Sequence, residues 1–124
     1  MKKAIATTAA PGAIGPYSQA IDAGAFVFAS GQLPIDPATG IMPEGIEAQT
    51  AMSLANVKAI LAEAGLTTDN VVKTTVFLAD MAEFAAMNAV YSKNFSDPFP
   101  ARSAVAVKDL PKGARVEIEV IASR

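Results

Sequence analysis

The 124-residue sequence contains no cysteine, no histidine and no tryptophan. Without cysteine the chain forms no disulfide and offers neither a thiolate nucleophile nor a thiolate metal site. Without histidine it has no imidazole base, no Ser-His-Asp triad and no histidine ligand for zinc. Catalysis must therefore use carboxylates, arginine, lysine, tyrosine, serine, backbone groups and water. This set favours substrates that are already electrophilic, because a positioned water is then sufficient.

Strong charge and long apolar runs are also lacking. Ten Lys and Arg against twelve Asp and Glu give a formal charge of -2, and the basic residues are scattered. Such a surface attracts a phosphate backbone only weakly, so we expect no nucleic-acid partner. No apolar run approaches the ~20 residues of a membrane span, so we expect no membrane partner. Thr7, Thr8 and Pro11 interrupt the apolar stretch that a secretory signal needs, which favours a cytoplasmic protein.

The composition predicts one small domain that associates with copies of itself. Hydrophobic residues make up 52% of the chain but aromatics only 6%, so the core is built from small aliphatic side chains. The length suits a single domain over residues 1–124. The mean hydropathy of +0.33 is high for a small soluble chain, whose domain exposes much of its surface. We therefore expect a homo-oligomer.

The hydrophobic pattern predicts the order β-β-β-α-β-α-β-β. Leu54, Val57 and Leu61 recur at helical spacing, and Gly65 stands where a C-terminal helix cap belongs. Asp80 suits the N-cap of a second helix. Alternating and β-branched segments between turn residues predict the strands. The predicted strands are 3–6, 18–22, 26–30, 71–78, 102–107 and 115–122, and the predicted helices are 45–65 and 80–94.

This element order predicts an α+β fold. Helices between strands act as crossover connections, which place both helices on one face of a single sheet. The other face is then uncovered and partly apolar. We expect other subunits to pack there.

Charged residues on the last two strands are candidates for a site. Alternation places Glu117 on the side of the last strand away from its buried residues, and places Arg102, Ala104 and Ala106 together on one side of the preceding strand. We predict that Arg102 and Glu117 face the same side of the sheet and meet across one cavity. A structural ion pair between strands or subunits is an equally good interpretation.

Six blocks of the sequence resemble the RidA (YjgF) family. The most specific is its C-terminal signature, which reads Pro-Ala-Arg-Ser-Ala-Val at residues 100–105, followed by Leu110 and by Val-Glu-Ile-Glu at residues 116–119. Five further blocks resemble the family in the same order, so a chance match is implausible. They are residues 15–19, 29–34, 56–60, 72–78 and 88–91.

The resemblance implies a chorismate-mutase-like (YjgF-type) fold. This fold has one six-stranded mixed sheet with two helices on one face, and its last strand is inserted between earlier strands. Members form homotrimers in which the sheets pack toward the centre, with three active sites in the clefts between subunits.

The resemblance also implies a function, the hydrolytic deamination of reactive 2-imino and enamine acids without a metal or a cofactor. The substrates are 2-iminopropanoate and 2-iminobutanoate, which pyridoxal-phosphate-dependent dehydratases release, and the products are 2-keto acids and ammonia. Arg102 would pair with the substrate carboxylate through two parallel hydrogen bonds. Glu117 would hold and deprotonate a water directed at C2.

Five more residues are carried over as substrate-binding. Tyr17, Ser30 and Gly31 would shape the pocket, Asn88 would support it, and Ala104 would act through its backbone carbonyl where many relatives have cysteine. Each of the first four also has a structural interpretation. Tyr17 suits a loop anchor, Asn88 a helix-end hydrogen bonder, and Ser30 and Gly31 a strand terminus.

Two rival functions use the same residues differently. A non-catalytic binder of small carboxylates, or a holdase-type protein, would use the same clefts and Arg102 without chemistry. The ribonuclease activity attributed to some relatives ranks last, because the chain has neither an imidazole pair nor a basic groove.

Overall fold

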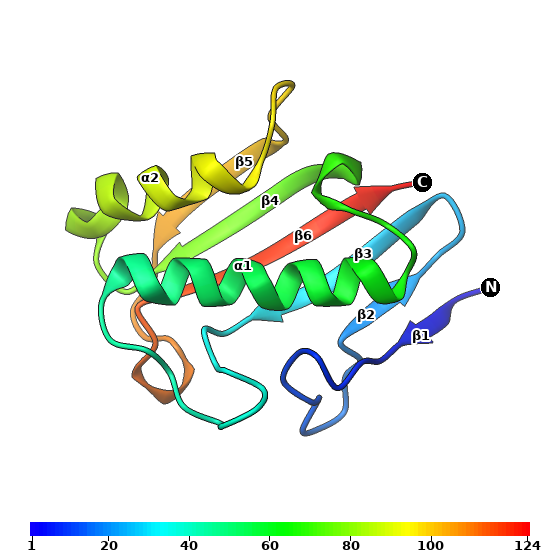
Figure 1. The fold of residues 1–124 in the computed structure, drawn as a ribbon, viewed down its shortest axis with the longest axis horizontal. Coiled ribbons are helices and arrows are strands. Elements are labelled where there is room, and N and C mark those ends of the chain that lie inside the picture. The colour runs from blue at the N-terminus through cyan, green and yellow to red at the C-terminus, as the bar shows by residue number, and fades with distance from the viewer.

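A computed structural model describes residues 1–124 as one six-stranded mixed sheet with two helices against one face (Figure 1). The predicted order of elements is confirmed, with three short 3-10 helices (η) added between them. None of the helices is both long enough and apolar enough to cross a membrane. The strands are β1 (Lys3–Ile5), β2 (Ala20–Asp22), β3 (Phe26–Gln32), β4 (Val71–Leu78), β5 (Ala101–Ala106) and β6 (Val116–Ser123), and the helices are α1 (Ile46–Glu63), η1 (Thr68–Asn70), η2 (Met81–Glu83), α2 (Phe84–Asn94) and η3 (Pro111–Gly113).

The strands lie in the order β1-β2-β3-β6-β4-β5. The last strand, β6, is antiparallel to both of its neighbours, whereas β4 and β5 are parallel. A parallel pair needs a crossover, and α2 supplies it between β4 and β5. The implied insertion of the last strand between earlier strands is thereby confirmed.

The ends of the helices follow the local chemistry of the sequence. Gly65 has a φ of 76° after α1, and the N–H of Leu66 reaches back to the carbonyl of Leu61 at 2.8 Å, as in a Schellman cap. Asp80 accepts a hydrogen bond from the N–H of Ala82 at 2.9 Å. Its cap therefore starts the 3-10 turn η2, which leads into α2.

The hydrophobic core lies between the sheet and the two helices. Val27, Val57, Val76 and Ile118 are completely buried there, and α1 crosses in front of β3 and β6 (Figure 1). Small aliphatic side chains allow this close approach. The opposite face of the sheet is uncovered, and Phe28 on it is 46% exposed. The expected open face is present.

The prediction that Arg102 and Glu117 share one side of the sheet is wrong within a protomer. In the parallel β4–β5 pair, Arg102 lies opposite Thr74, a fully buried residue on the helix-covered face. The two fully buried residues Val76 and Ile118 pair on that same face. Because successive side chains of a strand alternate, Glu117 points to the open face. Alternation determines sides within a strand only, and the pairing register relates one strand to the next.

Candidate active site

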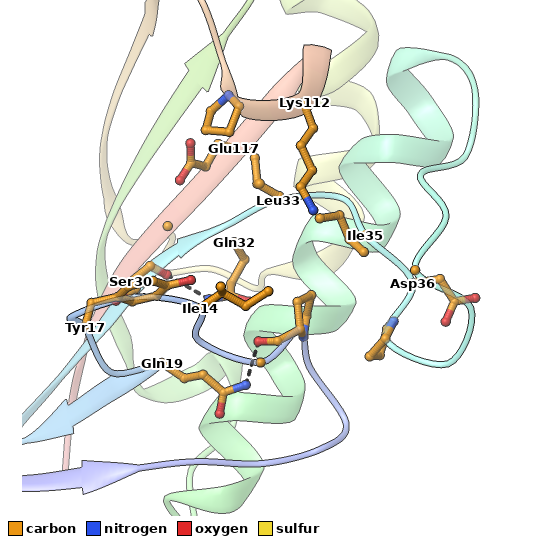
Figure 2. A pocket seen from close by; sticks show the side chains of 16 residues that line it. Ile14, Tyr17, Gln19, Ser30, Gln32, Leu33, Ile35, Asp36, Lys112 and Glu117 are labelled. Carbon is orange, nitrogen blue, oxygen red and sulfur yellow. Dashed lines mark hydrogen bonds between the residues drawn. The ribbon is translucent and has the colours of Figure 1, made fainter.

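A cavity of about 740 Å³ lies at the end of β6 that carries Glu117. Four of the predicted site residues, Tyr17, Ser30, Gly31 and Glu117, line it. Figure 2 shows the side chains of Tyr17, Ser30 and Glu117 on one side of the cavity, with Lys112 reaching in from η3. We call the four predicted residues the carboxylate half-site.

Gly31 lies against the carboxyl group of Glu117. The pairing of β3 with β6 shifts register between Ala29 and Gln32, so Gly31 sits in an irregularity of the strand. A Cβ atom at Gly31 would lie 2.9 Å from Cδ and 3.1 Å from Cγ of Glu117. The absence of a side chain at Gly31 therefore leaves the space that the Glu117 carboxyl group occupies. The structure thus brings Gly31 and Glu117 together at one end of β6.

Burial in the cavity raises the pKa of the Glu117 carboxyl, and the neighbouring Glu119 raises it further. A carboxylate with a raised pKa holds a proton more tightly, so it is a stronger general base once ionised. The other titratable groups that line the cavity belong to Tyr17, Asp36 and Lys112. Glu117 is therefore the candidate general base of this cavity.

Ser30 holds the loop that carries Tyr17. Its hydroxyl donates to the carbonyl of Ser18 at 2.6 Å, and its N–H donates to the carbonyl of Gln19 at 2.9 Å. The buried side chain of Gln19 in turn donates to the carbonyl of Pro11 at 2.7 Å (Figure 2). Sequence reasoning did not single out Gln19. Its position within the block 15–19 was the available signal.

Arg102 lies outside this cavity, against α2. Its Nη1 donates to Oδ1 of Asn88 at 2.6 Å. Its Cζ lies 4.7 Å from the ring centroid of Tyr91 and 5.3 Å from that of Phe84. Residues 84, 88 and 91 are spaced along one side of the helix, so α2 offers two aromatic rings and one amide oxygen to a single guanidinium. Ala104, the next residue on the same side of β5, packs against the core.

Arg102 has no acidic partner in the protomer. The two ion pairs of the chain join Arg115 to Glu83 and Arg124 to Asp22. The interpretation of Arg102 as a structural ion pair between strands is therefore wrong, and the version between subunits stays a prediction. Arg102, Asn88 and Ala104 form what we call the guanidinium half-site.

Two aromatic residues of α2, Phe84 and Tyr91, lie against the Arg102 guanidinium. Tyr91 is buried, and its hydroxyl shares a hydrogen bond of 2.7 Å with Oγ1 of Thr74. Burial raises the pKa of Tyr91, so its ring stays neutral and presents a π face to the cation. The spacing of Phe84 and Tyr91 around Asn88 was the signal for this role.

The seven predicted site residues thus form two half-sites that do not share a cavity. No residue of the guanidinium half-site lines the cavity that contains Glu117. The strand β4 lies between β5 and β6, and the two charged side chains point to opposite faces. No group of three acidic side chains lies close enough together to hold a metal ion.

Comparisons with known proteins identify the family. The sequence profile of the family described as Endoribonuclease L-PSP matches residues 7–124. A Salmonella typhimurium strain LT2 protein named 2-iminobutanoate/2-iminopropanoate deaminase is 52% identical over 127 residues, which covers 100% of this chain and 99% of the relative. The chain belongs to this family, that of the RidA and YjgF proteins.

Solved structures confirm the YjgF-type fold. The crystal structure of the YjgF gene product from Escherichia coli has a TM-score of 0.94 and 50% identity, with 98% of both chains covered. The crystal structure of E. coli TdcF with bound serine has the same TM-score and 46% identity, again with 98% of both chains covered.

Proposed function

We propose that this protein hydrolyses 2-imino acids and their enamine tautomers to 2-keto acids and ammonia. The active site consists of the carboxylate half-site of one protomer and the guanidinium half-site of a neighbour. The observation that carries the proposal is the Arg102 guanidinium, which is held by Asn88 and two aromatic rings but paired with no carboxylate. The 52% identical relative named 2-iminobutanoate/2-iminopropanoate deaminase supports it.

A homotrimer joins the two half-sites. Within one protomer Arg102 and Glu117 point to opposite faces of the sheet, so a small acid cannot touch both. The open face carries Phe26, Phe28 and Val105, each between 43% and 46% exposed, and this apolar surface needs a cover. A head-to-tail contact that closes on itself buries such a face in every copy and repeats the same cleft. Three equivalent sites follow.

The guanidinium half-site would hold the acid end of the substrate. The planar fork of Arg102 pairs with a carboxylate through two parallel hydrogen bonds, which orient the molecule as well as bind it. Asn88 already engages Nη1 at 2.6 Å and so directs the rest of the fork. The backbone carbonyl of Ala104 would accept a hydrogen bond from the imine nitrogen, and a change of side chain from cysteine to alanine leaves that carbonyl in place.

The carboxylate half-site would supply the water. Glu117 accepts a proton from a water as the water oxygen bonds to C2, the electron pair of the C=N bond moves to nitrogen, and Glu117 passes that proton to the nitrogen. In the resulting aminoalcohol, the hydroxyl proton passes through Glu117 to the nitrogen, the C–N bond breaks to release ammonia, and the hydroxyl oxygen becomes the carbonyl oxygen. An enamine enters the same sequence after it gains a proton at C3. Tyr17 and Ser30 enclose this side of the cleft.

The chemistry of these substrates implies their source. Pyridoxal-phosphate-dependent dehydratases that act on serine and threonine release such imines, so this protein would work beside them in the cytoplasm. The imine also hydrolyses in water, so the protein would shorten its lifetime. The serine in the TdcF crystal structure is a small carboxylate of similar size.

The test is a coupled assay in which a threonine dehydratase generates 2-iminobutanoate and the disappearance of the imine is followed with and without this protein. Loss of a buried charged contact costs about 2 to 5 kcal/mol, so we expect Arg102→Ala to lower kcat/KM by roughly tens- to thousands-fold. Arg124→Ala is the matched control, because it removes a guanidinium that pairs with Asp22, and neither residue belongs to a half-site. The fold should survive both changes.

The same assay separates the rival functions. The deaminase proposal fails if the imine disappears no faster with wild-type protein than in buffer. If 2-ketobutyrate then still raises the melting temperature, the protein is a binder of small carboxylates. The family description names an endoribonuclease, but the chain has no histidine to act on a ribose hydroxyl.

A further inference from the structure

Helix α1 carries buried polar side chains that bond the chain segments next to the carboxylate half-site. Gln49, Ser53 and Asn56 are at most 6% exposed, and their spacing of four and three residues places them on one side of the helix. Buried polar groups are costly unless they are hydrogen-bonded. Each of these three bonds the backbone of another segment rather than its own helix. We call them the α1 polar stripe.

Two members of the stripe hold the chain that follows Gly31. The hydroxyl of Ser53 donates to the carbonyl of Gln32 at 2.7 Å. The amide of Asn56 donates to the carbonyls of Leu33 and Ile35 at 3.0 and 2.9 Å. All three carbonyls belong to residues that line the cavity (Figure 2). The stripe therefore anchors the wall of the cavity directly after the irregularity in β3.

The third member holds the strand that carries the carboxylate. Oε1 of Gln49 accepts a hydrogen bond from the N–H of Arg115 at 2.8 Å, and its Nε2 donates to the carbonyl of Pro43 at 3.0 Å. Arg115 stands two residues before Glu117, at the entry to β6. The same helix thus holds both strands that bring Gly31 and Glu117 into contact.

We propose that the α1 polar stripe positions the Glu117 carboxyl group against Gly31, with Ser53 and Gln49 as its positioning residues. The expected effect on turnover rests on the proposed function, whereas the expected effect on the position of the Glu117 carboxyl group does not. The closeness of the two groups leaves little freedom, since even a Cβ on Gly31 would lie 2.9 Å from Cδ of Glu117. A small movement of either strand therefore changes the position and the burial of the carboxyl group.

Helix α1 also supplies a matched control. Thr50 is completely buried, and its hydroxyl donates to the carbonyl of Ile46 in the same helix at 2.7 Å. Thr50→Val removes a buried hydroxyl without changing any bond to the cavity wall. Ser53→Ala removes a buried hydroxyl that does hold that wall. Both variants lose a buried hydrogen bond, so any difference between their effects comes from the loss of the contact with the cavity wall.

The experiment measures kcat and KM for dehydratase-generated 2-iminobutanoate, and the titration of the Glu117 carboxyl by carbon NMR. We expect Ser53→Ala to lower kcat by about 10- to 100-fold, the scale of a misplacement near 1 Å, with KM little changed because Arg102 still binds the acid. The Glu117 titration should move to lower pH, because a loosened wall admits water and relieves burial. Thr50→Val should retain the wild-type kcat and titration.

The neighbouring charges are the same in every variant. Tyr17, Asp36 and Lys112 around the cavity, Glu119 on β6 and, in the proposed trimer, Arg102 of the neighbouring protomer are untouched, so a shift in the titration reports the surroundings of Glu117 itself. Gln49→Met acts from the β6 side and should reproduce the effect of Ser53→Ala. It also keeps the test open if Ser53→Ala does not fold.

Two results would overturn the inference. One is a Ser53→Ala or Gln49→Met protein with the kcat and the Glu117 titration of the wild type. The other is an equal loss of kcat in Thr50→Val, which would mean that any buried hydroxyl of α1 matters alike. If the wild type hydrolyses no imine, the proposed function fails separately. The NMR titration alone then tests whether the α1 polar stripe positions Glu117.

Discussion

Replacement of Gly31 by alanine tests the contact on which the carboxylate half-site depends. The added Cβ would overlap Oε2 of Glu117 and would also stand 2.9 Å from its Cδ, half an ångström closer than the 3.4 Å at which ordinary contacts begin. The φ of Gly31 is not positive, so the backbone itself accepts alanine. The strain therefore falls on the Glu117 side chain, whose carboxyl group must swing away from β3.

The expected effect is on turnover rather than on folding. A misplacement of about 1 Å near the reacting atoms can cost ~100-fold in rate, so we expect Gly31→Ala to lower kcat by about 10- to 100-fold. Alanine restricts the unfolded chain, which contributes roughly 0.4–1 kcal/mol of stability, and an off-rotamer glutamate costs about 0.5–1.5 kcal/mol. These effects oppose each other, so the free energy of unfolding should change by no more than ~1 kcal/mol.

The control is Gly12→Ala. Gly12 lines the same cavity, also has no positive φ, and a Cβ on it would meet no atom within 4 Å. Steady-state formation of 2-ketobutyrate and urea unfolding, run on both variants and the wild type, separate turnover from stability. A Gly31→Ala protein with the wild-type kcat, or a Gly12→Ala protein with the same loss, would refute the reasoning.

Two further predictions concern pH and assembly. A protonated Glu117 cannot accept a proton, and burial raises its pKa, so kcat/KM should rise with pH along a limb above 4.5, the ordinary value for glutamate. Glu117→Gln keeps the size of the side chain but should lose this limb and most of the turnover, and undiminished turnover would remove Glu117 from the mechanism. Phe28→Glu puts a charge on the exposed apolar face, so we expect light scattering to give the mass of a monomer without imine hydrolysis. A trimer that keeps full activity would contradict the assembly proposed for the site.

Local sequence signals predicted the elements because each of them depends on near neighbours. Helical spacing and a glycine cap marked α1, and both are present as expected. Alternation and β-branched residues marked β4, whose bounds agree with the prediction. Asp80 was a correct cap signal, although the turn that it starts is a 3-10 helix. The choice between an α-helical and a 3-10 first turn depends on small differences in packing that a single sequence does not record.

The candidate site was predicted less completely, and for a physical reason. The family blocks named residues of both half-sites, and the structure brings Gly31 and Glu117 together. The side chains that hold these residues, such as Ser53 and Tyr91, looked like ordinary helix and core positions. Ser53 bonds Gln32, 21 residues away along the chain, and Tyr91 bonds Thr74, 17 residues away, and no local pattern records such contacts.

The sequence by itself determined the order of strands and helices, the alternation of side chains within each strand, and the exclusion of thiol and imidazole chemistry. The tertiary structure alone decided on which face each charged side chain lies. Residues on both sides of β5 are largely exposed in the protomer, so hydrophobicity carried no signal for its orientation. Pairing with β4 determined it, and placed Arg102 and Glu117 on opposite faces. Register between strands is a long-range property, because it depends on which segments meet in the folded sheet.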